Sequence, residues 1–199
     1  MHYIEHLSKD KKLKKVIEAQ EPHVLVKRKK IYLYLCASIM SQQLSTKVAD
    51  VIYNRFLALY CKKEPTAQQI LDTPFETLRS IGLSNAKANY VQNVCRFFIE
   101  EKITDGQLYK MSDEAVIEKL TQIKGVGRWT VEMILMFSLQ HEDVLPVDDL
   151  GIQQAMIKLY KINYETKKEL YEKMQKHAAK WQPYRTYACV HLWRWKDKG

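Results

Sequence analysis

The sequence LTQIKGVGRWT, from Leu120 to Thr130, decides the fold, because an apolar helical pattern stops and restarts within it. Gly125 and Gly127 lie on either side of Val126, and glycine permits tight turns that residues with a Cβ atom disfavour. A second helix is expected from about Arg128, and its first backbone N–H groups suit a phosphate oxygen. The pattern therefore predicts a helical hairpin that grips a phosphate, although the same glycines could simply end one helix and turn the chain.

A short acidic motif follows the hairpin in LPVDDLGI, from Leu145 to Ile152. Asp148 or Asp149 is expected to open the next helix, which runs to about Leu159. An aspartate at a helix start usually does no more than accept hydrogen bonds from the first turn. The other interpretation is a functional carboxylate beside the hairpin, and the residues by themselves do not choose between the two aspartates.

The composition favours a globular chain with a polyanionic partner. Its 199 residues are 46% apolar, enough to bury a core as one domain or as two closely packed lobes. There are 32 Lys and Arg residues against 23 Asp and Glu residues, which gives a formal charge of +9. This charge favours nucleic acid over an acidic small molecule, although the runs Lys9 to Lys15 and Lys27 to Lys30 could simply be solvated faces.

The cysteines and the apolar segments suggest an intracellular protein. Cys36, Cys61, Cys95 and Cys189 form no CxxC pair, which argues against a zinc site and a disulfide framework. No segment resembles a secretory leader or approaches the ~20 apolar residues of a membrane span. We expect a soluble protein with no membrane partner, in the cytoplasm at the nucleoid if bacterial and in the nucleus if eukaryotic.

Apolar residues recur three and four positions apart along most of the chain, and strand-like alternation is scarce, so the predicted fold class is all-α with about ten helices. Ser84 and Ser112 are expected to cap helices, and Thr73 is expected to cap a helix whose first residue is Pro74. Further helical patterns cover residues 31–40, 48–59, 85–99, 113–120, 170–181 and 187–195.

The hairpin stretch LxxIxGVGRWT and the motif from Pro146 to Asp149 resemble the base-excision DNA glycosylases that carry a helix-hairpin-helix and a Gly/Pro-Asp signature. IGLSNAKANYV, from Ile81 to Val91, resembles a further segment of that family. WQPYRTYACVHLWRW, from Trp181 to Trp195, is similar to the C-terminal segment of its alkylbase members, of the DNA-3-methyladenine glycosylase II type. Matching stretches extend from about Leu35 to Trp195, and the chain resembles the compact form that lacks an extra N-terminal domain.

The resemblance implies two helical subdomains that flank a DNA-binding cleft. One lobe would contain about residues 1–35 and 145–199, and the other about residues 36–144, with the hairpin at 119–137. The implied partner is double-stranded DNA with alkylated bases, bound by a monomer.

The resemblance also implies an activity, because the family's catalytic aspartate matches Asp149, just before Leu-Gly-Ile. Such an enzyme flips alkylated purines of the 3-methyladenine and 7-methylguanine type out of the duplex and hydrolyses the N-glycosidic bond, leaving an abasic site. A fixed anion suits this reaction because positive charge develops on the sugar. Family members that also cut the backbone have a lysine where this chain has Trp129, which predicts a monofunctional enzyme. A non-catalytic DNA-binding hairpin and a glycosylase for oxidised or mismatched bases are the alternatives.

Several further residues are candidates for contacts with DNA. SIMSQQLSTKVAD resembles the family's edge that faces the minor groove, although Ser-Gln-Gln-Leu-Ser could equally be a polar turn. Trp129 and Tyr184 are the candidates for the base pocket, whereas Trp193 and Trp195 are expected to lie in the core. The predicted DNA-binding residues are Gln42, Gln43, Ser45, Lys124, Gly125, Val126, Gly127, Arg128 and Thr130.

No cofactor is expected to be required. Hairpins of this family commonly hold a monovalent cation, and the matching main-chain carbonyls here belong to Thr121, Ile123 and Val126. The resemblance thus implies a structural Na⁺ or K⁺, whereas the scattered cysteines exclude the iron–sulfur cluster of some relatives.

Overall fold

A computed structural model describes residues 2–197, and every regular element in that range is helical, as predicted. The helices are more numerous than the ten expected. The difference comes from short ones such as α1 (His2–Leu7), α5 (Ala67–Asp72), α6 (Phe75–Ser80) and α8 (Asp105–Leu108). Helices of one or two turns are too short to show a clear apolar period.

The chain divides into two compact units, which we call the terminal unit and the central unit. The terminal unit contains residues 2–26 and 140–197 of the described chain, and the central unit is Lys27–Leu139. The predicted boundary at residue 35 would have cut α3 (Ile31–Ser41) in the middle. The predicted boundary at 144 is also displaced, because the Val144 N–H donates to Thr186 Oγ1 (3.1 Å) within the terminal unit.

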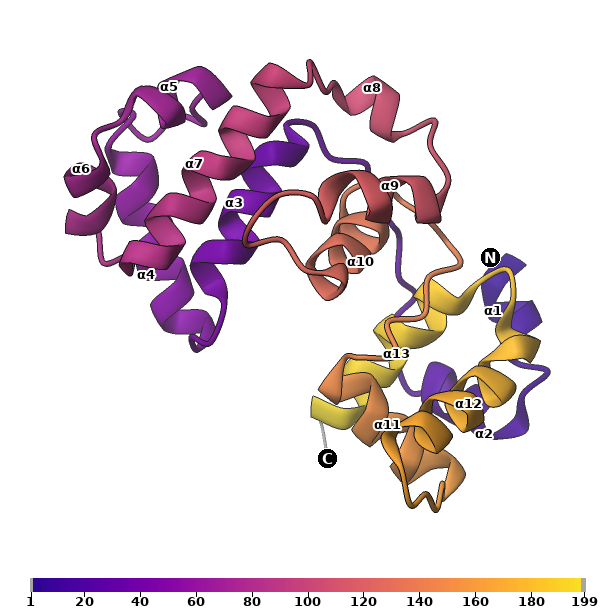
Figure 1. The fold of residues 1–199 in the computed structure, drawn as a ribbon. Coiled ribbons are helices and arrows are strands. Elements are labelled where there is room, and N and C mark those ends of the chain that lie inside the picture. The colour runs from indigo at the N-terminus through magenta and orange to yellow at the C-terminus, as the bar shows by residue number, and fades with distance from the viewer. Residues whose placement is uncertain (1, 198–199) are drawn as a thin grey trace. The chain divides into compact units, whose positions relative to one another are not determined.

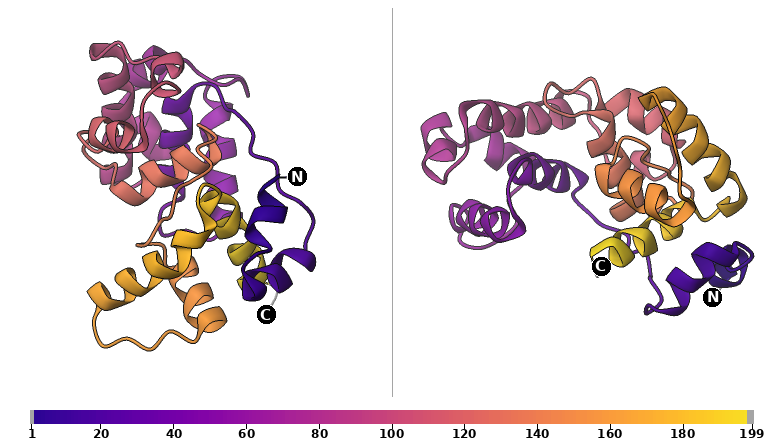
Figure 2. Two further views of the ribbon diagram at one scale, coloured as in Figure 1. Left: turned by 90° about the vertical axis from the view of Figure 1, so that its right-hand side faces the viewer. Right: turned by 90° about the horizontal axis from the view of Figure 1, so that it is seen from below.

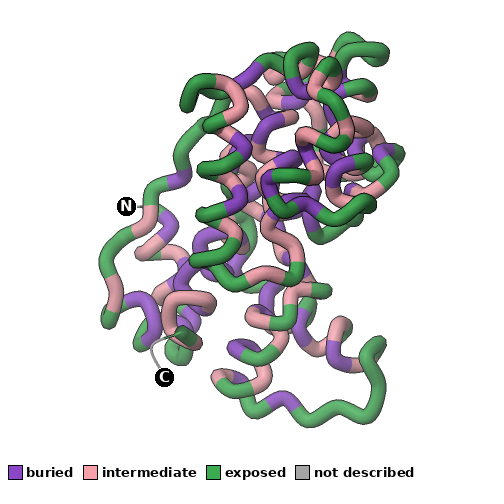
Figure 3. Tube along the Cα trace, turned by 90° about the vertical axis from the view of Figure 1, so that its left-hand side faces the viewer, coloured by how far each residue is buried: buried purple, intermediate pink, exposed green. Residues whose placement is uncertain are grey.

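The central unit is built around α7 (Asn85–Glu100), which packs against α3 and α5 (Figure 1). One face of α7 is buried through small and apolar side chains, including Ala88, Val91 and Phe98. The remaining helices of this unit are α4 (Thr46–Ala58), α6, α8, α9 (Asp113–Leu120) and α10 (Arg128–Phe137). Along α7 the buried positions recur at the spacing that an amphipathic helix requires, and Figure 3 colours the whole chain by burial.

In the terminal unit, α13 (Arg185–Asp197) packs against α11 (Leu150–Tyr160) and α2 (Lys11–Glu18). The unit also contains α1, α12 (Lys167–Ala178) and the 3-10 helix η1 (Ala179–Trp181), seen from two further sides in Figure 2.

A buried carboxylate joins α2, α11 and η1 within the terminal unit. Asp10 caps α2 and accepts hydrogen bonds from the Tyr160 hydroxyl and from Trp181 Nε1 (3.1 Å). Lys180 Nζ lies 3.0 Å from the same carboxylate. Burial by itself would raise the pKa of Asp10, but the hydrogen bonds from Tyr160, Trp181 and Lys180 outweigh burial and lower the pKa to about 2.

Most helix starts are where the sequence predicted them. Ser84 and Ser112 each accept a backbone hydrogen bond and cap α7 and α9. The prediction for Thr73 is wrong, because Pro74 is the capping residue of α6. The Thr73 hydroxyl instead donates back to the Gln69 carbonyl (2.7 Å), which ties it to the preceding helix α5.

Candidate functional site

The turn between α9 and α10 requires glycine at position 125. Gly125 has φ +104°, a backbone conformation that residues with side chains rarely adopt. A Cβ atom built there would lie 2.2 Å from Cγ of Tyr90, which projects from α7. The turn is therefore held directly against α7, and the Asn93 side chain of the same helix donates to the Lys124 carbonyl (3.3 Å).

Gly127 leaves the start of α10 open. It is the capping residue of α10 and supplies no side chain to cover the first-turn N–H groups. A Cβ atom at Gly127 would meet nothing within 4 Å. Lys124 and Arg128 are exposed beside this opening, and Arg128 Nε pairs with Glu132 Oε1 at 3.0 Å. Open N–H groups at a helix start together with two cations form a good site for a phosphate.

Two residues predicted to touch DNA at the hairpin have buried side chains, so any contact they make with DNA would be through the backbone. Val126 is 5% exposed and Thr130 is 2% exposed, so neither presents a side chain to a ligand. Their side chains lie on the inner face of the hairpin, together with Ile123 and Val131. Thr130 begins the apolar stripe of α10, which explains why its side chain is buried. Its contact with DNA stays a prediction.

A second turn, between α3 and α4, contains the predicted residues Gln42, Gln43 and Ser45. Gln43 is exposed with φ +59°, and Ser45 is the capping residue of α4. Lys87 Nζ donates to the carbonyls of Met40 (2.9 Å) and Gln42 (2.6 Å), and burial lowers the pKa of this lysine. The role of Lys87 was missed, because the sequence places it in the Gly-Leu-Ser-x-x-Lys segment but does not show what it bonds.

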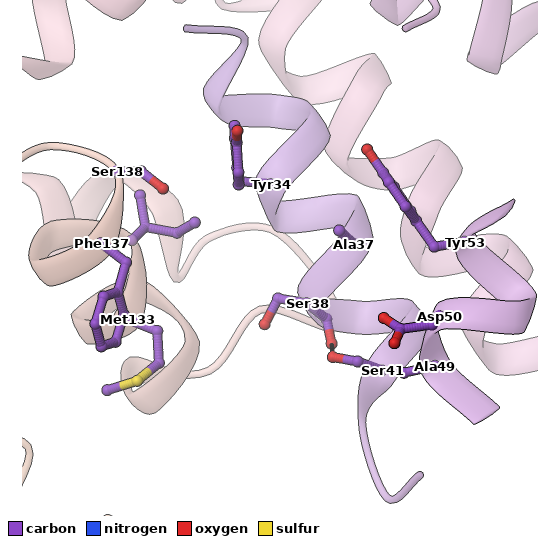
Figure 4. Close-up of a pocket in the computed structure, with 11 residues that line it drawn as sticks. Tyr34, Ala37, Ser38, Ser41, Ala49, Asp50, Tyr53, Met133, Phe137 and Ser138 are labelled. Atoms are coloured by element: carbon purple, nitrogen blue, oxygen red, sulfur yellow. Dashed lines mark hydrogen bonds between the residues drawn. The ribbon is translucent and has the colours of Figure 1, made fainter. Parts of the chain in front are cut away.

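The central unit also contains a pocket of about 330 Å³ between α3, α4 and α10 (Figure 4). Its lining residues are Tyr34, Ala37, Ser38, Ser41, Ala49, Asp50, Tyr53, Met133, Ile134, Phe137 and Ser138. Trp129, predicted for a base pocket, is 39% exposed on the first turn of α10 and is not among them.

Asp149 lies in the terminal unit at the start of α11, as its position in the sequence predicted. Its Oδ1 accepts hydrogen bonds from the Ile152 N–H (2.8 Å) and from Trp193 Nε1 (2.8 Å). Gly151 makes room for the indole, because a Cβ atom there would lie 2.9 Å from Trp193 Nε1. The two donors hold the carboxylate in one orientation.

The expectation that Trp193 and Trp195 lie in the core is wrong. Both are only partly buried. Trp193 bonds to Asp149, and Lys158 Nζ lies 5.0 Å from the centre of the Trp195 ring. The indole N–H of a tryptophan that is partly withdrawn from water usually has a hydrogen-bond acceptor, and for Trp193 the candidate carboxylate of Asp149 accepts it.

The neighbouring aspartate has different contacts. Asp148 is exposed, lies 3.2 Å from Lys167 Nζ and accepts a hydrogen bond from the Tyr171 hydroxyl, both on α12. The structure thus separates two aspartates that the residues alone could not separate. Asp148 binds the adjacent helix, whereas Asp149 caps α11 and binds Trp193.

The start of α13 fixes the segment that leads to Asp149. Arg185 bonds both carboxylate oxygens of Asp143, at 2.7 and 2.9 Å, and the Asp143 carbonyl at 2.8 Å. The Thr186 hydroxyl donates to the His141 carbonyl at 2.6 Å. These contacts span more than forty positions of sequence, which is why sequence patterns did not reveal them.

Tyr184, the other residue predicted for the base pocket, lies in the terminal unit. It lines a separate pocket of about 400 Å³ with Tyr3 and Tyr187, and its ring meets the ring of His6 edge to face. Trp129 and Tyr184 belong to different units, so their meeting in one base pocket stays a prediction.

Within residues 2–197, no helix is long and apolar enough to cross a membrane. The same range contains no group of three or more His, Cys, Asp or Glu side chains that could hold a metal ion.

Comparison with known proteins places these features in a family. The family model described as HhH-GPD superfamily base excision DNA repair protein matches residues 36–180. DNA-3-methyladenine glycosylase 1 of Schizosaccharomyces pombe is 37% identical over 186 residues, which cover 92% of this chain and 80% of that protein.

Solved structures give the same result. The 3-methyladenine DNA glycosylase Mag1 of Schizosaccharomyces pombe, in complex with abasic DNA, has a TM-score of 0.83 and 35% identity, covering 98% of this chain and 96% of that one. A DNA-3-methyladenine glycosidase from Bacillus halodurans has a TM-score of 0.81 and 35% identity, covering 95% and 86%. The chain belongs to the HhH-GPD superfamily of base excision DNA repair proteins.

Proposed function

We propose that this protein is a monofunctional DNA-3-methyladenine glycosylase, which extrudes alkylated purines from duplex DNA and hydrolyses their N-glycosidic bond to leave an abasic site. The observation that carries this proposal is the carboxylate of Asp149, fixed at the start of α11 by Trp193 and the Ile152 N–H. The named relatives support the choice of alkylated bases. Incubation of the purified protein with alkylated duplex DNA, followed by chromatography of the released bases, tests the proposal.

Two groups of residues would have separate roles, one in binding the DNA backbone and the other in cleaving the glycosidic bond. The open start of α10, with Lys124 and Arg128, would bind a backbone phosphate beside the damaged nucleotide. Asp149 would stabilise the positive charge that builds on the sugar as the base leaves, and it would orient the attacking water. An alkylated purine leaves readily because it carries a positive charge that is neutralised on departure.

We assign Trp193 to positioning Asp149. Trp193→Phe keeps a ring against Gly151 but removes the N–H donor, so we expect the single-turnover rate of base release to fall roughly tenfold. Affinity for abasic DNA should stay unchanged. In an Asp149→Asn background the same substitution should have no further effect. A weaker affinity with an unchanged rate would contradict the assignment.

The absence of a lysine at position 129 predicts that no Schiff base forms with the sugar. Borohydride treatment of a mixture with abasic-site DNA should trap no substantial covalent product. A bifunctional family member that has the lysine serves as the positive control. Strong trapping by this protein would contradict the monofunctional assignment.

Two remaining proposals concern a monovalent cation at the hairpin and the place of the protein in the cell. We propose that main-chain carbonyls of Thr121, Ile123 and Val126 hold a Na⁺ or K⁺ ion at the hairpin. The Ile123 carbonyl already faces into the turn, where it accepts the Val126 N–H at 2.9 Å. The protein would act as a monomer inside the cell, at the nucleoid of a bacterium or in the nucleus of a eukaryote.

A further inference from the structure

The pocket of the central unit contains a carboxylate among aromatic rings. In Figure 4, α3 runs between Asp50 and Tyr53 of α4 on one side and Met133 and Phe137 of α10 on the other. Phe137 is 40% exposed, so its ring is accessible to a ligand. The pocket volume of about 330 Å³ lies in the range of small-molecule sites.

The pocket lies between the two elements that were predicted to grip DNA. α3 and α4 are joined by the turn that contains Gln42, Gln43 and Ser45, and Ser41 and Ala49 on either side of this turn line the pocket. α10, which supplies Met133 and Phe137, begins at the open hairpin turn. A base extruded between these two elements would meet the pocket directly.

The charge of the pocket is negative. Within the described part of the chain, Asp50 supplies the one carboxylate that lines it, and no Lys, Arg or His lines it. Asp50 is exposed, and among residues 2–197 no Lys, Arg or His side chain pairs with it, so the chain does not neutralise its charge. Its carboxylate extends from α4 toward Ser38 and Ser41 of α3 (Figure 4).

We propose that Asp50 is a specificity-determining residue that favours cationic purines over neutral ones. This inference rests on the proposed function. A purine alkylated at a ring nitrogen carries a positive charge, which a nearby carboxylate attracts and which aromatic rings also stabilise. A neutral base gains nothing from this charge and must displace the water that solvates it.

The test measures the single-turnover rate of base release from two lesions placed in the same duplex sequence. The cationic base is 7-methylguanine, and the neutral base is hypoxanthine. We expect Asp50→Asn to lower the rate for 7-methylguanine about tenfold and to leave hypoxanthine within about twofold. Asp50→Glu keeps the charge and should retain most of the preference. Glu100→Gln, an exposed position on α7, removes the same charge elsewhere in the unit and should leave both rates unchanged.

The outcomes separate the two claims. If the wild type releases no methylated purine from alkylated duplex DNA, the proposed function fails and this inference falls with it. If the wild type is active but Asp50→Asn lowers both rates equally, or lowers neither, the role of Asp50 is overturned while the glycosylase remains. If the wild type does not release hypoxanthine, the comparison uses 7-methylguanine alone. Slower release by Asp50→Asn, with normal release by Asp50→Glu and Glu100→Gln, then supports the proposal. Normal release by Asp50→Asn refutes it. Thermal unfolding of each variant confirms that it is folded.

Discussion

Asp149→Asn is expected to lower the single-turnover rate of methylated-adenine release from alkylated duplex DNA by about 10²–10³-fold. Asparagine can still accept the Ile152 N–H and Trp193 Nε1 hydrogen bonds through its amide oxygen, so α11 should keep its cap. The variant loses the negative charge, which is what the developing positive charge on the sugar requires. The measurement is the rate of base release with enzyme in excess.

Asp148→Asn is the matched control, because it removes the same charge one residue away. Asp148 contacts Lys167 and Tyr171 on α12, and these exposed contacts contribute little to stability. This variant should release bases at nearly the wild-type rate. Equal losses in both variants would indicate a general effect of charge, and wild-type activity in Asp149→Asn would remove the basis of the proposed chemistry.

The features of the fold that could be predicted from the sequence depend on interactions between residues that are close together in the chain. The glycines at 125 and 127, the serine caps and the aspartate at the start of α11 all act within a few residues of their own position. The helical period also accounts for the burial of the Thr130 side chain. Thr130 begins a stripe that continues through Val131 and Ile134, all of them buried.

The missed features are contacts between segments that are distant in sequence. The bond between Trp193 and Asp149 joins residues 44 positions apart, and that between Lys87 and Gln42 joins residues 45 apart. Tryptophan at helical spacing is usually a core residue, so its pattern gave no sign of a polar partner. Pairings of this kind depend on how helices pack, which single-sequence patterns do not specify.

Gly125→Ala is expected to destabilise the central unit by about 3 kcal/mol, the sum of a left-handed backbone penalty and overpacking. The added Cβ would lie 2.2 Å from Cγ of Tyr90, so either the ring or the turn must move. The thermal midpoint should fall by roughly 6–12 °C for a chain of this size. Affinity for abasic DNA should fall as well, because the start of α10 would lose its position.

Gly127→Ala is the matched control, since its φ is −94° and its Cβ would meet nothing within 4 Å. Its thermal midpoint should stay close to that of the wild type, because the substitution causes neither backbone strain nor a clash. In the double variant Tyr90→Ala/Gly125→Ala, the ring that clashes is absent and only the backbone penalty remains. Its destabilisation should therefore be smaller than the sum of the two single effects. Additive effects would show that Tyr90 does not press on the turn, and an unchanged midpoint in Gly125→Ala would show that the turn does not depend on glycine.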